Sequence, residues 1–131
     1  MRETLKTKLI VFERKVLRKI SGTTKERDGT GRIKTNDELD KLTRHKDIIN
    51  YIKAKGLSWF GNLHRMSEER MVKKICKWKQ MLTRPLERPN NRWEDDIRNE
   101  MKKLKIKNWT SCIQDRNNWK LYVEKAKTFN D

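Results

Sequence analysis

The sequence predicts an all-α protein, a small irregular bundle of about five to six helices with no sheet. Three observations lead to this prediction. Apolar residues recur at intervals of three and four along most of the chain, as they do on one side of an α-helix. No segment shows the alternating, Val- and Ile-rich pattern of a half-buried strand. The two prolines stand only at positions 85 and 89, so the periodic segments on either side contain no strong helix breaker.

The core that such a bundle can bury is small for a chain of 131 residues, which is the length of one domain. Leu, Ile, Val and Phe number 28, about 21% of the chain, close to the roughly 20% below which highly charged chains tend to be disordered. Five tryptophans offset this shortage, because each can bury on the order of 200 Å². Four of them lie on clean apolar stripes and are expected in the core: Trp59, Trp93, Trp109 and Trp119.

The first helix carries one apolar stripe with spacings of four, three, four and four, formed by Leu5, Leu9, Phe12, Val16 and Ile20. Ser21 and Gly22 are expected to end it. Residues 23–34 are mostly polar and contain three turn-forming residues, so they are predicted to be a loop with at most a short extended piece near Ile33.

A second helix is expected to begin at Thr35, because Glu38 stands three residues later, as in a capping box. A third helix is predicted over residues 47–66, weakened midway by Gly56. Its packing side is expected to consist of Ile49, Ile52, Trp59, Leu63 and Met66.

A fourth, basic helix is predicted over residues 68–82, with Ser67 as its cap and acidic residues in its first turn. Two neighbouring stripes run along it. The apolar stripe, which is expected to pack, consists of Met71, Ile75, Trp78 and Leu82. The basic stripe, which is expected to face solvent, consists of Arg70, Lys73, Lys74 and Lys77.

The two prolines make residues 85–91 the expected linker of the chain. Residues 1–84 and 92–131 then form two subdomains or one compact domain. After the linker, a fifth helix is expected from Trp93 through Leu104, and a sixth begins at Trp109. The apolar residues of the sixth are Trp109, Ile113, Trp119, Val123 and Ala126.

Charge is the strongest functional signal. Thirty-four Lys and Arg residues against eighteen Asp and Glu give a net charge of +16. A nucleic-acid phosphate backbone suits this excess best, because each neutralised phosphate releases condensed counterions. Between residues 70 and 84 there are six basic residues and no acid. The predicted contact residues are Arg70, Lys73, Lys74, Lys77, Trp78, Lys79 and Arg84.

Trp78 has two interpretations. It lies between Lys77 and Lys79, which suits stacking on a base with phosphate contacts on either side. It also lies on the apolar stripe of its helix, which suits the core.

Several other kinds of site are not expected. Cys76 and Cys112 are too few for a disulfide scaffold and, with no secretory signal, point to reduced thiols in an intracellular protein of the nucleus or cytoplasm. No apolar run is long enough to cross a bilayer. No two of the potential zinc ligands are close enough in the sequence to form half of a zinc site; these ligands are His45, His64, Cys76 and Cys112. No catalytic residues, metal, cofactor or small-molecule substrate are predicted.

The segment Trp93-Glu94-Asp95-Asp96 has the order of the polymerase motif in which two carboxylates hold Mg²⁺ ions. That motif requires a strand–turn–strand context. Here the acids follow a proline and open a helix, whose positive end favours them, so they are interpreted as a helix start.

The ordered segments LSWFGNLHRM at 57–66, RPNNRWEDDI at 88–97, NW at 108–109 and QDRNNW at 114–119 resemble the region after the polymerase in reverse transcriptases of non-LTR (LINE-type) retrotransposons. Residues 12–20 and 28–36 resemble the stretch that follows the polymerase palm. The resemblance covers roughly residues 9–127. The family's catalytic palm and endonuclease lie N-terminal to this region and are not present in this sequence.

The resemblance and the charge together imply a non-catalytic module that grips template RNA or target DNA. A protein-interaction or structural helical module is an alternative, and a transposon relic without selected function is another. The sequence does not predict whether RNA or DNA is preferred, whether particular nucleotide sequences are preferred, or which oligomeric state the protein adopts.

Overall fold

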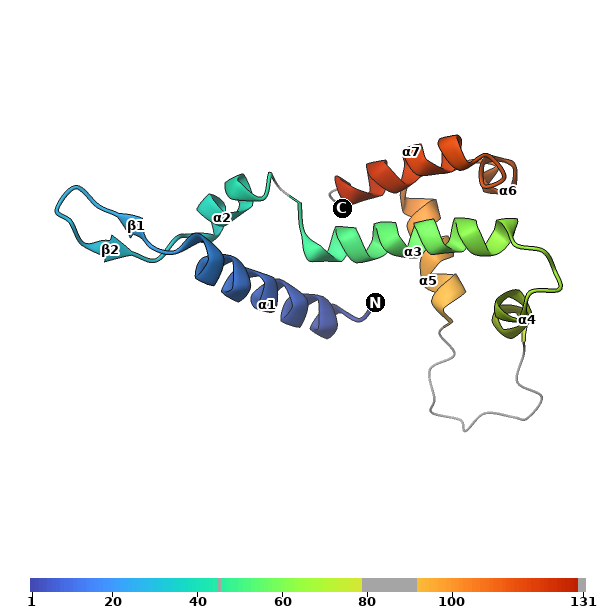
Figure 1. Ribbon diagram of the computed structural model, residues 1–131, viewed down its shortest axis with the longest axis horizontal. Coiled ribbons are helices and arrows are strands. Elements are labelled where there is room, and N and C mark those ends of the chain that lie inside the picture. The colour runs from blue at the N-terminus through green and yellow to red at the C-terminus, as the bar shows by residue number, and fades with distance from the viewer. Residues whose placement is uncertain (45, 79–91, 130–131) are drawn as a thin grey trace. The chain divides into compact units, whose positions relative to one another are not determined.

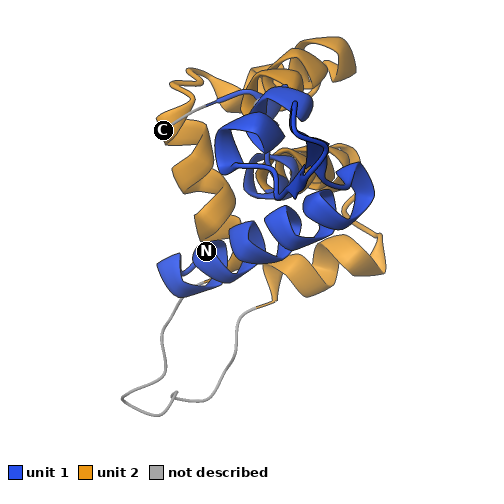
Figure 2. Cartoon of the chain, turned by 90° about the vertical axis from the view of Figure 1, so that its left-hand side faces the viewer, with its two compact units in different colours: residues 1–52, 127–131 blue, residues 53–126 orange. Residues whose placement is uncertain are grey.

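The computed structural model describes residues 1–44, 46–78 and 92–129. The chain divides into two compact units, shown in separate colours in Figure 2. Unit 1 consists of residues 1–52 with 127–131, and unit 2 of residues 53–126. The predicted linker at 85–91 lies outside the described residues.

The described residues are mainly helical, as predicted, but they form seven helices and one two-stranded sheet (Figure 1). The expectation of five to six helices without any sheet is therefore wrong in detail. None of the described helices has the length and apolar character needed to cross a bilayer.

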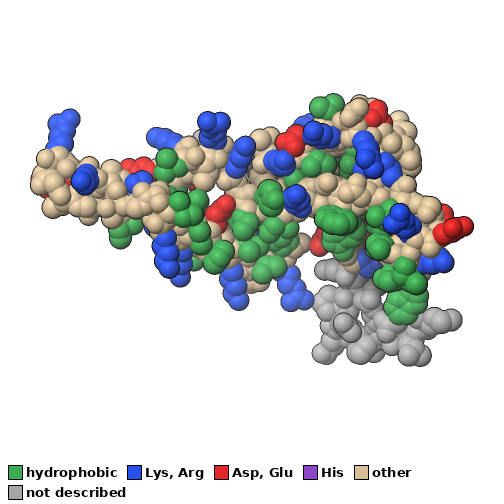
Figure 3. Space-filling view, in the orientation of Figure 1, with side chains coloured by type: hydrophobic (Ala, Val, Ile, Leu, Met, Phe, Trp, Pro, Cys, Tyr) green, Lys and Arg blue, Asp and Glu red, His purple; other side chains and the backbone are tan. Residues whose placement is uncertain are grey.

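Unit 1 begins with α1 (Glu3–Ser21), which Gly22 ends in the left-handed region at φ +64° while its N–H donates to Arg18 O at 3.1 Å. The helix ends where predicted, at Ser21 and Gly22. Leu5, Phe12 and Ile20 of its apolar stripe are exposed, and no residue of α1 is buried. Figure 3 shows hydrophobic side chains along α1 with Lys and Arg beside them.

The segment predicted as a loop contains a small antiparallel hairpin of β1 (Thr24–Lys25) and β2 (Gly31–Arg32). Its turn is held by Glu26 N–H, which donates to Thr30 O at 2.9 Å, and Gly29 supplies a positive φ of 85°. Such a conformation is unfavourable for residues with a Cβ. Each strand is only two residues long, too short to show alternation.

Arg32 joins the hairpin to the next helix, α2 (Asn36–Leu42), because its guanidinium contacts both Glu26 at 2.8 Å and Glu38 at 2.7 Å. The predicted capping box is confirmed: Glu38 N–H donates to the Thr35 hydroxyl, and Thr35 N–H donates to the Glu38 carboxylate. Hydrogen bonds from Arg32 and from the Thr35 backbone lower the pKa of Glu38 to about 2.

The long helix α3 (Ile48–Arg65) matches its predicted range to within one residue at each end. Asp47 caps it, since Asn50 N–H donates to the Asp47 carboxylate at 2.6 Å. In unit 1 the Asn50 amide also donates to Phe129 O at 2.9 Å, which ties Phe129 to the first turn of α3. The predicted packing side is wrong at Ile52 and Trp59, which are exposed. The buried residues of α3 are the predicted Ile49 together with Asn50, Ala54, Leu57, Phe60 and Gly61.

Unit 2 is built around α3, with α5 (Trp93–Lys103) crossing it and α7 (Arg116–Lys127) running beside it (Figure 1). Two glycines of α3 allow these close approaches. A Cβ on Gly56 would lie 2.6 Å from Ile97 Cδ1 of α5, and a Cβ on Gly61 would lie 2.5 Å from the Trp119 ring of α7. Gly56, which the sequence analysis took as a weakness of the helix, is thus a packing site.

The core of unit 2 is continued by the buried residues Ile97, Met101, Leu104, Ile106, Ile113, Trp119 and Ala126. The sixth predicted helix is two helices, α6 (Trp109–Cys112) and α7, because Asp115 begins a new helix by accepting from Asn117 N–H at 2.9 Å. Of the four tryptophans expected in the core, only Trp119 is buried.

Adding a methyl group should be more harmful at Gly61 than at Gly56. At Gly61 the methyl meets a buried indole ring, whereas at Gly56 it meets the movable end of Ile97. Overpacking costs about 1–3 kcal/mol, against a gain of roughly 1 kcal/mol in helix propensity. We therefore expect Gly61→Ala to lower the free energy of unfolding by about 1 kcal/mol and Gly56→Ala to change it little, as measured by urea unfolding. Equal effects would contradict this packing.

Candidate nucleic-acid interface

The basic helix exists but is shorter than predicted within the described residues. It runs as α4 (Met71–Lys77), and Trp78 N–H donates to Ile75 O at 3.2 Å at its end. Ser67 does not cap it. Instead the chain turns before the helix, with Arg70 N–H donating to Ser67 O at 3.2 Å. Leu82 and the predicted contact residues Lys79 and Arg84 lie outside the described residues.

The predicted orientation of α4 is wrong. Met71, Ile75 and Trp78, expected to pack, are all exposed, with Trp78 65% exposed. Lys73, expected to face solvent, is only 9% exposed. The core of unit 2 is already filled by α3, α5 and α7. The inner side of α4 instead lies at the C-terminal end of α3, where carbonyl groups need donors.

Lys73 supplies those donors. Its ammonium donates to the carbonyl oxygens of Met66 at 2.8 Å and of His64 at 3.2 Å, both at the end of α3. It also forms an ion pair with Glu68 at 2.9 Å. A lysine with these three partners holds the turn between α3 and α4, so its charge is engaged within the protein.

Glu68 connects the buried and exposed lysines of α4, because its second carboxylate oxygen accepts from Lys77 Nζ at 2.6 Å. Hydrogen bonds from Lys77 and Lys73 lower the pKa of Glu68 to about 2. The Lys77–Glu68 pair itself is well exposed. Pairs of this kind contribute only about 0–1 kcal/mol, so a stronger anion can compete for Lys77.

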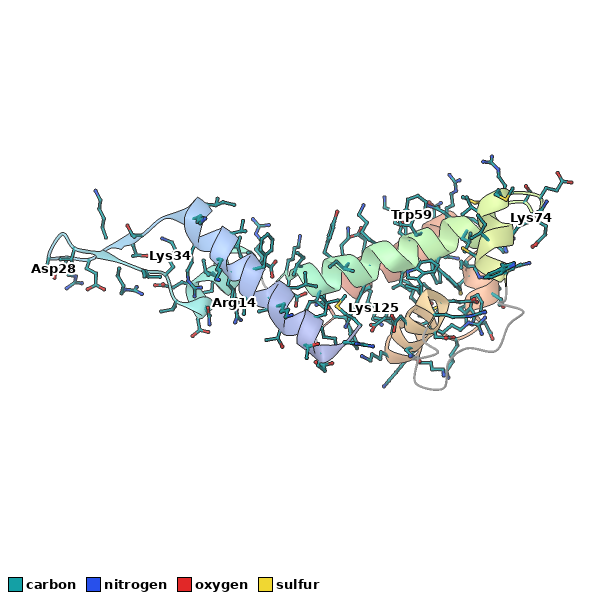
Figure 4. All side chains as sticks on the ribbon, turned by 90° about the horizontal axis from the view of Figure 1, so that it is seen from below. Arg14, Asp28, Lys34, Trp59, Lys74 and Lys125 are labelled. Carbon is teal, nitrogen blue, oxygen red and sulfur yellow. The ribbon has the colours of Figure 1, made fainter. Side chains whose placement is uncertain are left out.

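Three predicted contact residues present their side chains to solvent on or next to α4: Arg70, Lys74 and Lys77. Trp78 follows them directly. Figure 4 shows Lys74 on α4 and Trp59 on α3 projecting away from the ribbon of unit 2. Figure 3 shows hydrophobic side chains with Lys and Arg among them at the α4 end of this unit. We call Arg70, Lys74, Lys77 and Trp78 the α4 surface.

A cleft of about 260 Å³ opens beside the α4 surface. Its walls combine aromatic rings with cationic groups and one carboxylate. The lining residues are Phe60, Leu63, His64, Lys73, Cys76, Lys77, Trp78, Arg92, Trp93 and Glu94. The carboxylate, Glu94, accepts from Arg98 at 2.7 Å, so its charge is balanced from within the same helix.

Three side chains that line the cleft, Phe60, His64 and Trp93, belong to an aromatic cluster that also includes Trp109. The Phe60 ring lies 4.4 Å from His64 and 6.2 Å from Trp93, measured between centroids, and Trp109 lies 5.3 Å from His64. Burial, followed by the nearby charge of Lys73, lowers the pKa of His64. The lowered pKa favours the neutral imidazole, which adds a polar edge to the cleft.

A second basic segment was missed by the sequence analysis. Lys102, Lys103, Lys105 and Lys107 are exposed, and they alternate with the buried residues Leu104 and Ile106. These lysines could have been found from their alternation with apolar residues. They were missed because the segment spans a helix end, where Lys105 turns the chain at φ +54°, so a search for helical spacing does not detect the alternation.

The acids of the polymerase-like segment lie where predicted, in the first turn of α5, and Asp95 accepts from Arg92 N–H at 3.3 Å. Across the described residues, no three His, Cys, Asp or Glu side chains gather as a metal site would require. His45 lies outside those residues. Cys76 and Cys112 are free thiols.

Comparisons of the chain with protein-family models, with curated proteins and with solved structures found no match. The role of the α4 surface therefore has to be inferred from its own residues and from the sequence motifs of the chain.

Proposed function

We propose that this protein is a non-catalytic nucleic-acid-binding module, derived from the region after the polymerase in a LINE-type reverse transcriptase, and that the α4 surface is its main contact. The single observation that carries the proposal is the pairing of an exposed indole with exposed cations. Trp78 is 65% exposed immediately after a helix that presents Lys74 and Lys77. Proteins that bind nucleic acid without sequence preference combine aromatic platforms with positive charge in this way.

The charge of the whole unit supports the same partner. Unit 2 contains nineteen Lys and Arg residues against nine Asp and Glu, a net charge of +10. A surface of this sign attracts polyanions from a distance and speeds their association.

Removing the three exposed cations of the α4 surface should weaken binding in a way that salt reveals. Each phosphate contact contributes about 0.7–0.9 to the slope of log K against log salt. We expect Arg70→Gln, Lys74→Gln and Lys77→Gln together to reduce that slope by about two to three units. Fluorescence anisotropy with labelled RNA and DNA of the same sequence, across a salt series, measures it.

The matched control removes the same charge elsewhere in unit 2, by Lys102→Gln, Lys105→Gln and Lys107→Gln. A smaller loss is expected there. Equal losses would contradict the assignment to the α4 surface, and binding that does not respond to salt would contradict the function itself.

A protein partner is the second candidate, because α4 also exposes Met71, Val72 and Ile75. Contiguous exposed apolar side chains are typical of protein interaction sites. This alternative predicts that Ile75→Ser abolishes the interaction while leaving nucleic-acid affinity and its salt slope unchanged.

A further inference from the structure

We propose that the cleft beside α4 receives one unpaired nucleobase, so that the protein prefers single-stranded to double-stranded nucleic acid. This inference depends on the proposed function. It adds the class of nucleic acid and the place where a base is held, neither of which the net charge can specify.

The walls of the cleft have the chemistry that a nucleobase requires. Trp78 and Trp93 line the cleft, and both are at least partly exposed, so a flat ring can reach their faces. Phe60 also lines the cleft and is buried. Every nucleobase has a π-face that stacks on such rings, whereas a base in a duplex is already stacked on its neighbours and is not accessible.

Positive charge lies around the same opening. Lys77 and Arg92 line the cleft beside the aromatic rings. Among the described residues, Lys77 pairs with the exposed carboxylate of Glu68. A base in the cleft brings its own phosphates to this rim, so the cations and the rings serve one ligand. An uncharged aromatic ligand makes no use of the cations.

The size of the cleft also suits one base. Sites for drug-sized ligands occupy about 300–1,000 Å³, and the cleft of about 260 Å³ falls just below that range. It suits a single ring system better than a base pair. Its neutral imidazole and its carboxylate, His64 and Glu94, provide polar edges for the hydrogen-bonding groups of a base.

The test compares two tryptophans of similar exposure. Trp78 is 65% exposed and lines the cleft, whereas Trp59 is 61% exposed on α3 and does not. Stacking of one base contributes about 1–3 kcal/mol, which corresponds to a change in affinity of about fivefold to 150-fold. We expect Trp78→Ala to weaken binding of a single-stranded oligonucleotide by at least about fivefold and to leave binding of the matching duplex unchanged. Trp59→Ala should change neither, and Trp78→Phe should retain most of the affinity.

Anisotropy titrations at one fixed salt concentration, with RNA and DNA in single-stranded and duplex form, give all of these values. The inference is overturned if single strand and duplex bind equally, or if Trp59→Ala and Trp78→Ala have the same effect. Either result is compatible with a steep salt dependence, so the proposed function can survive the loss of this inference. Circular dichroism of each variant checks that the fold is intact.

Discussion

Replacing Trp119 with alanine should strongly destabilise unit 2. The side chain is 2% exposed, its indole N–H donates to Leu57 O at 2.8 Å, and its ring lies against Gly61. Removal of a buried tryptophan costs about 3–5 kcal/mol, a large part of the roughly 5–15 kcal/mol that stabilises a domain. Urea unfolding followed by circular dichroism at 222 nm measures the loss without relying on tryptophan fluorescence.

Two further variants make this result specific. Trp59→Ala removes an equally large but exposed side chain and should change the free energy of unfolding by less than about 1 kcal/mol. Trp119→Phe keeps a ring in the core but loses the hydrogen bond, so an intermediate effect is expected. Similar urea midpoints for Trp119→Ala and Trp59→Ala would show that α7 does not pack on α3 in this way.

Lys73→Met should destabilise the protein by about 1–3 kcal/mol, the usual cost of leaving buried polar groups without their partner. The carbonyl groups of His64 and Met66 lose their donor, and Glu68 loses one of two lysines. The matched change Lys74→Met, one residue further along and exposed, should have an effect within about 0.5 kcal/mol. If the two variants unfold alike, Lys73 does not hold the end of α3.

The pKa of Glu68 provides a second measurement of the same contact. It lies at about 2 because Lys77 and Lys73 donate to the carboxylate. The folded state therefore favours the ionised form, and this contribution to stability is present above about pH 4.5 and is lost as the pH falls toward 2. In Lys73→Met we expect an NMR titration to show a pKa closer to the ordinary value, because one of the two lysine hydrogen bonds that lower it is lost.

The positions of the helices were predictable from the sequence because helix ends depend on neighbouring residues. The bounds of α1 and α3 and the capping box of α2 follow from apolar spacing and from one Thr–Glu pair. The division between α6 and α7 was also encoded locally, in Asp115. It was missed because the apolar residues on both sides keep a helical spacing.

The direction in which each helix faces was not predictable in the same way. An apolar stripe shows which side of a helix can pack, but the partners decide which side does. On α3, Gly56 and Gly61 mark the sides where α5 and α7 approach, and these positions have no hydrophobic side chain to count. On α4, an inward lysine is favoured because the partner is a set of carbonyl groups and not an apolar core.

This difference changes how the basic cluster is interpreted. From the sequence, Lys73, Lys74 and Lys77 formed one equivalent set. In the structure Lys73 holds the turn between α3 and α4, Lys77 forms an ion pair with Glu68, and Lys74 faces solvent. A substitution of all three lysines would mix loss of folding with loss of binding, whereas Arg70, Lys74 and Lys77 can be changed with Lys73 left in place.

The two glycines of α3 also bear on whether this gene is under selection. Every single-base change in a glycine codon that replaces the residue introduces a side chain with a Cβ, and at Gly61 that atom would meet the Trp119 ring at 2.5 Å. Drift alone would replace these two codons as readily as any codon for a surface lysine. A gene maintained for a folded product should instead retain both glycines while its exposed positions vary. Polymorphism at these two codons, compared with codons such as that of Lys120, is therefore a genetic test that separates a working protein from a decaying insertion.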